Sequence, residues 1–390
     1  MVIATDPREL RLMKALDYCL KEFDADKGAF TKGSAWDGKP IEVKEDQLPL
    51  PSLVFICLVM FKGYRYWGKD EKLLWTIPFK YKSYPLLLSY RKFGLQILSN
   101  SGATPPQALV KEMLKQLNKA IKITEKLVQP YADQQVKAGN VTVVNSYHKL
   151  NMMYRFFRRK AKERFRRAGR APASLAPGKT GHIAPLVNWR VKHEHEGAYY
   201  ATAMIDAFFS RLEHVLVLIL PFVGFDPVRE DLVAFISSGW KDKFKRAFDV
   251  EGNRLAKSLY DQLDSIRERY RNPVTHGYFE KAGASLYFHV PGLYAVPVSL
   301  SKFREGLHYS FFPITEASLD EVCRVFDKTD TLLKSGAPGK GFLFARSGLD
   351  IGFDVNSIAE LHTACYSNKS LKEYIELRAH WDTVVSNMDW

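Results

Sequence analysis

The sequence predicts a mainly α protein: a helical bundle with an inserted β-hairpin, preceded by a separate N-terminal region that is α-rich but of mixed α+β character. Three observations support this. Several long segments repeat apolar residues at three- and four-residue steps, the period of an amphipathic helix. Two β-rich runs flank Pro291-Gly292, as in a hairpin. With 390 residues, the chain can form two or three domains.

Changes in composition along the chain divide it into four parts. Residues 1–170 form an N-terminal region of unknown role that ends in a basic helix. Residues 171–189, rich in Pro, Gly and Ala, form a linker. Residues 190–335 form the helical bundle, with its hairpin at 284–300. Residues 336–390 form a C-terminal extension that ends in a helix.

The N-terminal region is expected to combine helices with short strands. One helix begins with Thr104-Pro105-Pro106, an N-cap followed by a first-turn proline signature. The aromatic- and lysine-rich segment 64–90 is expected to contain short strands. Helices are predicted at residues 7–23, 104–128 and 143–168.

The chain carries a net charge of +14, which favours a polyanionic partner, with nucleic acid first and an acidic membrane surface second. The densest basic run lies at the end of the 143–168 helix, where Glu163 is the one acid among nine cations. Interleaved aromatic residues either stack on bases or pack the helix onto the protein. The candidate nucleic-acid-binding residues are Arg155, Arg158, Arg159, Lys160, Lys162, Arg164, Arg166, Arg167 and Arg170.

Other sites are not supported by the sequence. Gly178-Lys179-Thr180 resembles the end of a phosphate loop, but Ala173 stands where that motif needs glycine. The four cysteines show no CxxC spacing, and the histidines have no ordered partners, so we expect neither a metal nor a cofactor. The most apolar run, residues 48–61, is too short to span a bilayer. We therefore expect a cytoplasmic protein without a membrane partner.

The bundle itself is predicted from three helical segments. Residues 197–220 form a long, mostly apolar helix without an internal Gly or Pro after its first residue. Residues 229–248 form a second helix. Residues 253–271 form a third, with one apolar face, and it should end at Asn272 because a residue before proline avoids the α conformation. Residues 318–334 are the expected last helix, followed by a loop at 334–340 and an extended segment at 342–355.

The third helix leads into the segment Arg271-Asn272-Pro273-Val274-Thr275-His276. An arginine is always charged and presents a planar fork to phosphate oxygens, so that it can stabilise a pentacoordinate phosphorus. A histidine can take the proton of an RNA 2'-hydroxyl or protonate the leaving 5'-oxygen. Together they suffice for cleavage of RNA without a metal ion.

This segment resembles the catalytic motif of HEPN-domain ribonucleases, and Tyr278 extends the resemblance to HEPN toxins and phage-defence or abortive-infection proteins. The resemblance implies that Arg271, His276 and Asn272 are catalytic. It also implies an acidic residue that faces the motif from the long helix, for which Glu213 is the first candidate and Asp206 the second. Further implications are a homodimer, RNA as the partner, and an antitoxin or regulatory partner that modifies Tyr278.

Two alternatives remain. Arg190 and His195 have the same spacing as Arg271 and His276, but they lack the polar residue after the arginine and the preceding helix. The chain could also be a non-catalytic HEPN-like nucleic-acid-binding or sensor protein that uses the basic 155–170 segment. In that case its activity would depend on the basic run rather than on Arg271.

Overall fold

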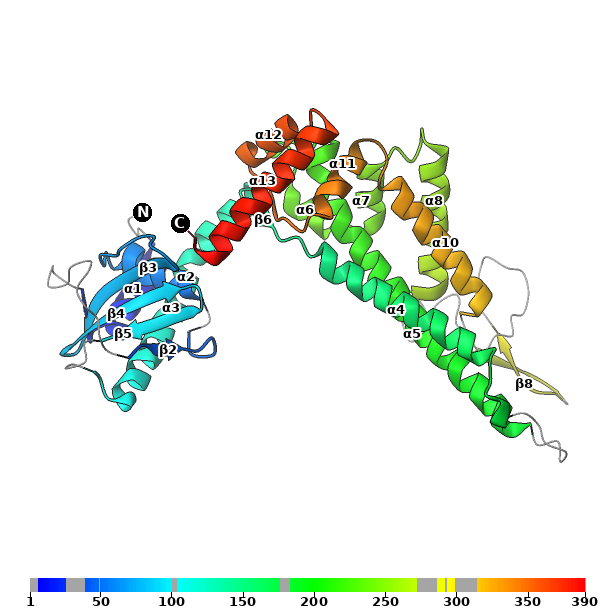
Figure 1. Cartoon of the computed structure of the whole chain (residues 1–390), viewed down its shortest axis with the longest axis horizontal. Coiled ribbons are helices and arrows are strands. Elements are labelled where there is room, and N and C mark those ends of the chain that lie inside the picture. The colour runs from blue at the N-terminus through cyan, green and yellow to red at the C-terminus, as the bar shows by residue number, and fades with distance from the viewer. Residues whose placement is uncertain are drawn as a thin grey trace. The chain divides into compact units, whose positions relative to one another are not determined.

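The computed structural model describes residues 6–25, 39–48, 50–99, 104–175, 183–271, 286–291, 293–298 and 314–389 (Figure 1). The chain divides into two compact units. The first, which we call the sheet unit, comprises Met1–Val136 and Glu376–Trp390, and the second, the helical unit, comprises Lys137–Ile375. Each has a hydrophobic core of its own.

The sheet unit contains a five-stranded antiparallel sheet in the order β1-β3-β4-β5-β2. Two-residue turns join β3 to β4 and β4 to β5, and Lys82 in the first turn has a positive φ. The strands are β1 (Phe23–Ala25), β2 (Ile41–Val43), β3 (Leu73–Tyr81), β4 (Tyr84–Arg91) and β5 (Gly94–Leu98). The helices are α1 (Pro7–Cys19), α2 (Pro51–Phe55) with its π continuation η1 (Ile56–Phe61), and α3 (Gln107–Lys137).

The sheet and α3 form the core of this unit. Along α3, the residues that recur at helical spacing, such as Val110, Leu117 and Ile121, are buried. They belong to the same cluster as Ile77 and Phe79 of β3. The prediction of helices combined with strands in this region is confirmed, although β3 and β4 are long strands rather than short ones.

The helical unit is built around a pair of long helices. Its elements are β6 (Thr142–Val143), α4 (Tyr147–Ala168), η3 (Ala173–Leu175), α5 (Ala184–Leu218), η4 (Leu220–Val223), α6 (Leu232–Ser237), α7 (Trp240–Ala247), α8 (Arg254–Ile266), η5 (Arg267–Arg271), β7 (Leu286–Val290), β8 (Leu293–Val298), α10 (Glu316–Leu332), α11 (Gly336–Ala345), β9 (Ile351–Gly352) and α12 (Val355–Ala364). Helix α13 (Asn368–Asn387) begins in this unit. The two strands of the predicted hairpin, β7 and β8, are antiparallel.

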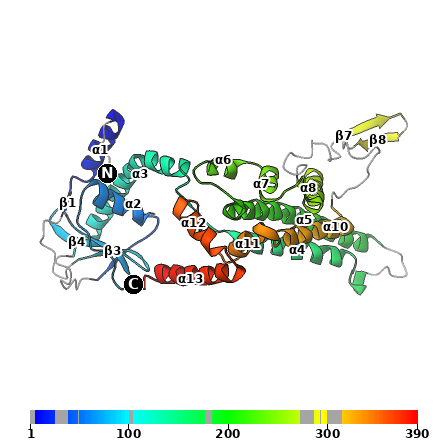
Figure 2. The same cartoon turned by 90° about the horizontal axis from the view of Figure 1, so that it is seen from above.

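Helices α4 and α5 lie side by side along their length (Figures 1 and 2). Tyr147, Tyr154, Ala161 and Ala168 are buried at seven-residue steps, as in a coiled-coil seam. The helices are antiparallel, and Gly197 of α5 permits a close approach. A Cβ atom there would lie 3.0 Å from the ring of Phe165.

A buried arginine links the two helices of this pair near their middle. The Arg211 guanidinium of α5 donates to Asn151 Oδ1 of α4 at 2.9 Å and to Asp330 Oδ1 of α10 at 2.5 Å. It also lies over the Tyr154 ring, 4.6 Å from its centroid. Next to it, Phe208 stacks on Phe326 of α10 with a centroid distance of 3.5 Å. Three helices therefore meet at one ion pair and one aromatic stack.

A histidine ties the start of α4 to α5. The backbone N–H of Ser146 donates to His214 Nε2 at 2.9 Å, so that nitrogen carries no proton. Burial lowers the pKa of His214, because the charged imidazolium would lose its hydration. The neutral ring is thus the form that this contact requires.

The structure corrects several sequence expectations. Residues 336–345, predicted as a loop running into an extended segment, form α11, because Gly341 lets this helix pack closely on the end of α5. A Cβ atom at Gly341 would lie 2.8 Å from Ile219. Helix α5 begins at Ala184, inside the expected linker, and the basic helix α4 belongs to the helical unit rather than to a separate N-terminal region. No helix in the described part of the chain is long and apolar enough to cross a membrane.

We predict that Arg211→Met lowers the free energy of unfolding of the helical unit by about 3–5 kcal/mol, because it leaves the Asp330 carboxylate without its partner. Urea unfolding followed by circular dichroism measures this. Arg229→Met is the matched control, since the Arg229 side chain is 86% exposed, and it should cost less than about 0.5 kcal/mol. Equal costs for the two variants would show that the buried pair does not hold the helices together.

Candidate active site and nucleic-acid interface

Helix α8 leads into η5 and so to Arg271, the first residue of the predicted motif. Asn253 caps α8, with its side-chain Oδ1 accepting from the N–H groups of Leu255 and Ala256 at 3.0 and 3.1 Å. Its apolar face, including Leu259 and Leu263, is buried. The helix predicted at residues 253–271 is thus confirmed. Its last turn, η5, is a π-helix, a form that occurs mostly in short stretches, frequently at functional sites.

Arg271, the last residue of η5, turns toward α5. Its Nε donates to Asp206 Oδ1 at 2.8 Å, and its guanidinium lies over the ring of Phe209, 5.6 Å from the centroid. The Arg271 side chain is 25% exposed, so it is held by protein groups without being sealed in the core.

The rest of the motif lies outside the described residues. Asn272, His276 and Tyr278 are not among the described residues, so the approach of His276 to Arg271 remains a prediction from the sequence. The described structure brings together Arg271 and Asp206, and it places them at the junction of η5 with α5.

The two candidate acidic residues of α5 have different partners. Asp206 forms the ion pair with Arg271, whereas Glu213, our first choice, lies 3.5 Å from the ammonium of Lys243 on α7. The two carboxylates are seven residues apart, about two turns, so they lie on nearly the same face of α5 but about 10 Å apart along its axis, where different elements pack. The position of Arg271 therefore makes Asp206, the second choice, the residue that orients it.

The competing match at Arg190 and His195 has a different setting. Both residues lie within the continuous helix α5, and Arg190 Nε donates to Glu194 at 2.8 Å on the exposed surface. An i,i+4 pair of this kind is a common feature of a solvated helix. The match therefore lacks the helix end at which Arg271 stands.

The basic run of α4 separates into two groups. Five of its nine cations pair with carboxylates: Arg158 with Asp327, Lys162 with Asp320, Arg164 with Glu196, and both Lys160 and Arg167 with Glu163. The pair between Arg158 and Asp327 is bidentate, at 2.5 and 2.6 Å, and its hydrogen bonds hold the pKa of Asp327 below its usual range. These five cations are partly neutralised.

The other four arginines are exposed, and within the described chain none of them forms an ion pair: Arg155, Arg159, Arg166 and Arg170. Three of them lie on one side of α4 and line a shallow open depression. The aromatic residues between them also form two groups, one buried and one exposed. Tyr154 and Phe165 are buried against the bundle, whereas Phe156 is 43% exposed and lies beneath the Arg159 guanidinium. One exposed ring among free cations is suited to a nucleic-acid strand.

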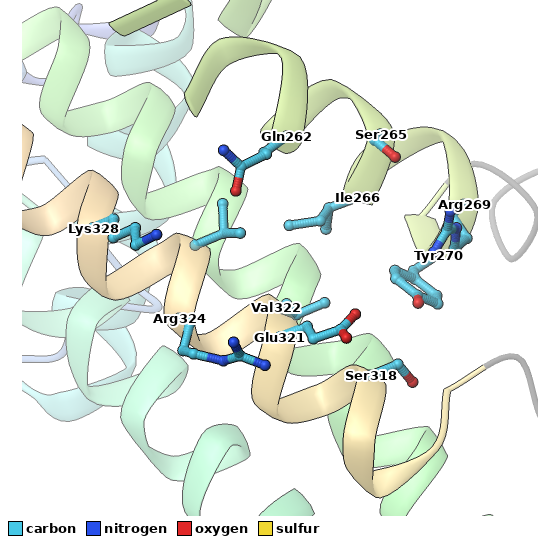
Figure 3. Close-up of a pocket in the computed structure, with 11 residues that line it drawn as sticks. Gln262, Ser265, Ile266, Arg269, Tyr270, Ser318, Glu321, Val322, Arg324 and Lys328 are labelled. Atoms are coloured by element: carbon cyan, nitrogen blue, oxygen red, sulfur yellow. The ribbon is translucent and has the colours of Figure 1, made fainter. Parts of the chain in front are cut away.

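One feature was not predicted from the sequence. A hollow of about 310 Å³ lies between α8–η5 and α10, with Arg269, Arg324 and Lys328 among the residues around it (Figure 3). Its two walls are separated by about 50 residues of chain, and no sequence motif links them. Only the packing of α10 against α8 brings them together.

Comparisons with known proteins return no relative. No family model matches the chain, and no curated protein or solved structure resembles it significantly. Within the residues that the structure covers, there is also no group of three or more His, Cys, Asp or Glu side chains that could hold a metal ion.

We predict that the triple variant Arg155→Glu, Arg159→Glu and Arg166→Glu weakens binding of single-stranded RNA. Because each lost phosphate contact removes about 0.7 from the slope of log K against log salt, the slope should fall by about 2. Fluorescence anisotropy of a labelled oligoribonucleotide at several salt concentrations measures it.

The matched control reverses three exposed lysines of α3, Lys111, Lys115 and Lys119, which changes the net charge by the same amount. If this control weakens RNA binding as much as the α4 variant does, the effect comes from net charge alone. The assignment of an interface to α4 would then be wrong.

Proposed function

We propose that this protein is an endoribonuclease of HEPN type that cleaves RNA without a metal ion. The observation that carries the proposal is Arg271, held by Asp206 at the end of a helix and followed by the sequence Asn-Pro-Val-Thr-His. A cation fixed by a carboxylate, with an imidazole five residues further along the chain, supplies the two groups that the reaction needs.

In the proposed reaction, the 2'-hydroxyl of RNA attacks the neighbouring phosphorus and displaces the 5'-oxygen. Arg271 stabilises the additional negative charge on the phosphoryl oxygens. His276 removes the proton of the 2'-hydroxyl or delivers one to the leaving oxygen, and Asn272 helps to bind or orient the phosphate. The products are a 2',3'-cyclic phosphate and a free 5'-hydroxyl.

The exposed arginines of α4 support an RNA substrate. Arg155, Arg159 and Arg166 can neutralise backbone phosphates, and Phe156 can stack on a base. Because α4 packs along much of α5, and α5 also carries Asp206, the proposed RNA-binding surface and the proposed site share one helix pair.

The biological role that we propose is that of a toxin or antiviral defence effector. It would act in the cytoplasm as a homodimer, in which two copies of the motif meet over one RNA strand. A dimer suits the chemistry, since one histidine removes a proton while the other donates one. An antitoxin or other regulator that modifies Tyr278 would control it.

A second candidate function is non-catalytic binding of nucleic acid. The observation that favours it is the set of exposed α4 arginines that have no acidic partner among the described residues, which does not require the motif. A binding protein or sensor of this kind would lose its function on charge reversal along α4 and keep it when Arg271 is changed.

We predict that the purified protein cleaves single-stranded RNA in the presence of EDTA and leaves 2',3'-cyclic phosphate ends, and that His276→Ala abolishes the cleavage. Gel analysis of labelled oligoribonucleotides, with end-group mapping, measures both. Circular dichroism should show that the variant is folded. Undiminished cleavage by His276→Ala would exclude this residue as the acid-base group, and dependence on a divalent cation would exclude the proposed mechanism.

We also predict that Asp206→Asn lowers kcat about tenfold to a hundredfold, because Arg271 loses the carboxylate that orients it, with a smaller change in KM. Glu213→Gln is the matched control on the same helix. Since Glu213 pairs with Lys243, this variant should cleave at close to the wild-type rate. The reverse order of effects would contradict the assignment of Asp206.

A further inference from the structure

The hollow between α8–η5 and α10 has the composition of a small-ligand site. Its volume of about 310 Å³ lies at the lower end of the range for sites that hold small organic molecules. Ile266 of α8 and Val322 of α10 form an apolar floor, and Tyr270 lies at one end (Figure 3). A flat heterocycle can be covered by such a floor.

Cations surround this floor. Arg269 comes from η5, whereas Arg324 and Lys328 lie one turn apart on α10. Glu321 is the only acidic residue among those that line the hollow in the described part of the chain. Among the described residues, none of these four charged side chains is in an ion pair, although most of the cations on α4 are. The unneutralised charge favours an anion.

The remaining polar groups suit the edge of a nucleobase. Gln262 offers its amide oxygen as an acceptor, since its amide nitrogen donates to the backbone oxygen and Oγ of Ser258, and Glu321 also accepts hydrogen bonds from N–H groups. An apolar floor, a polar edge and a cationic rim together match the three parts of a nucleoside phosphate. A simple inorganic anion would leave the floor uncovered, and an uncharged nucleoside would leave the cations unpaired.

The hollow adjoins the proposed site through the chain itself. Tyr270 directly precedes Arg271, and the two side chains diverge within η5: Tyr270 lines the hollow beside α10, while Arg271 reaches Asp206 on α5. A ligand that contacts Tyr270 in the hollow would therefore touch the residue that directly precedes Arg271, the cation that is proposed to bind the scissile phosphate.

We propose that this hollow binds one nucleoside phosphate, with the base on Ile266 and Val322 and the phosphate at Arg324 and Lys328. This inference deepens the proposed function and rests on it for one point only. If the chain cuts RNA, the bound unit is the nucleotide next to the scissile phosphate. The recognition chemistry is the same for a free nucleotide.

Isothermal titration calorimetry of the full chain with adenosine 5'-monophosphate tests the proposal. We expect saturable binding, at least tenfold weaker for adenosine and for inorganic phosphate, since each makes only part of the contacts. Arg324→Glu with Lys328→Glu should weaken binding of the monophosphate at least tenfold. Both side chains are exposed on α10, so thermal melting should show an intact fold.

The control is the double variant Arg254→Glu and Lys257→Glu, which changes the same charge on exposed positions of α8 away from the hollow. It should bind the monophosphate as the wild type does. Absence of binding to the wild type, or equal losses in the two double variants, would overturn the proposal.

Two further measurements separate this proposal from the nuclease. His276→Ala should lose cleavage and keep the binding of adenosine monophosphate, so binding without any cleavage would leave the hollow standing and the nuclease rejected. Cleavage of RNA by a protein that does not bind the monophosphate would support the nuclease and reject the ligand site in the hollow. A short single-stranded oligoribonucleotide that displaces the monophosphate identifies the source as an RNA strand, and failure to displace it identifies a free nucleotide.

Discussion

The helical unit depends on the packing of α5 against its neighbours. This helix contacts α4, α7, α10, α11 and η5, so most of the core is built on its surface. Its close approach to α4 requires a glycine at position 197, and its far end accepts α11 only because position 341 is also a glycine. A shift of α5 along its axis would displace each of these contacts together, including the one that holds Arg271.

Helix α5 takes part in two arginine–aspartate pairs, and the two pairs differ in how deeply the arginine is buried. Arg211 is buried, bound by Asp330 and Asn151, and fully used in joining three helices. Arg271 pairs with Asp206 at a partly exposed position, where the guanidinium is oriented but remains within reach of a ligand. The same chemical pair is buried between helices in one place and partly exposed in the other, where we propose that Arg271 binds phosphate.

The fold also decides which cations pair with carboxylates and which remain exposed. The nine cations of the basic run from Arg155 to Arg170 appear equivalent in the sequence, yet the carboxylates of α5, α10 and α4 itself neutralise five of them. Arg155, Arg159 and Arg166 remain exposed on one side. Around the hollow beside η5, by contrast, no carboxylate of the described residues pairs with Arg324 or Lys328. The number of cations in the basic run therefore overstates the charge that its described residues leave unpaired.

The sequence by itself determined the helices with a clear apolar period, including α8 with its Asn253 cap, and the hairpin at Pro291-Gly292, because these depend on neighbours a few residues apart. Only the tertiary structure decided that Asp206 rather than Glu213 meets Arg271, that the glycine-rich segment at 336–341 is helical, and that α8 and α10 enclose a hollow. Each of these depends on which helix lies opposite. Helical periodicity specifies which face is buried and leaves open its partner and its register.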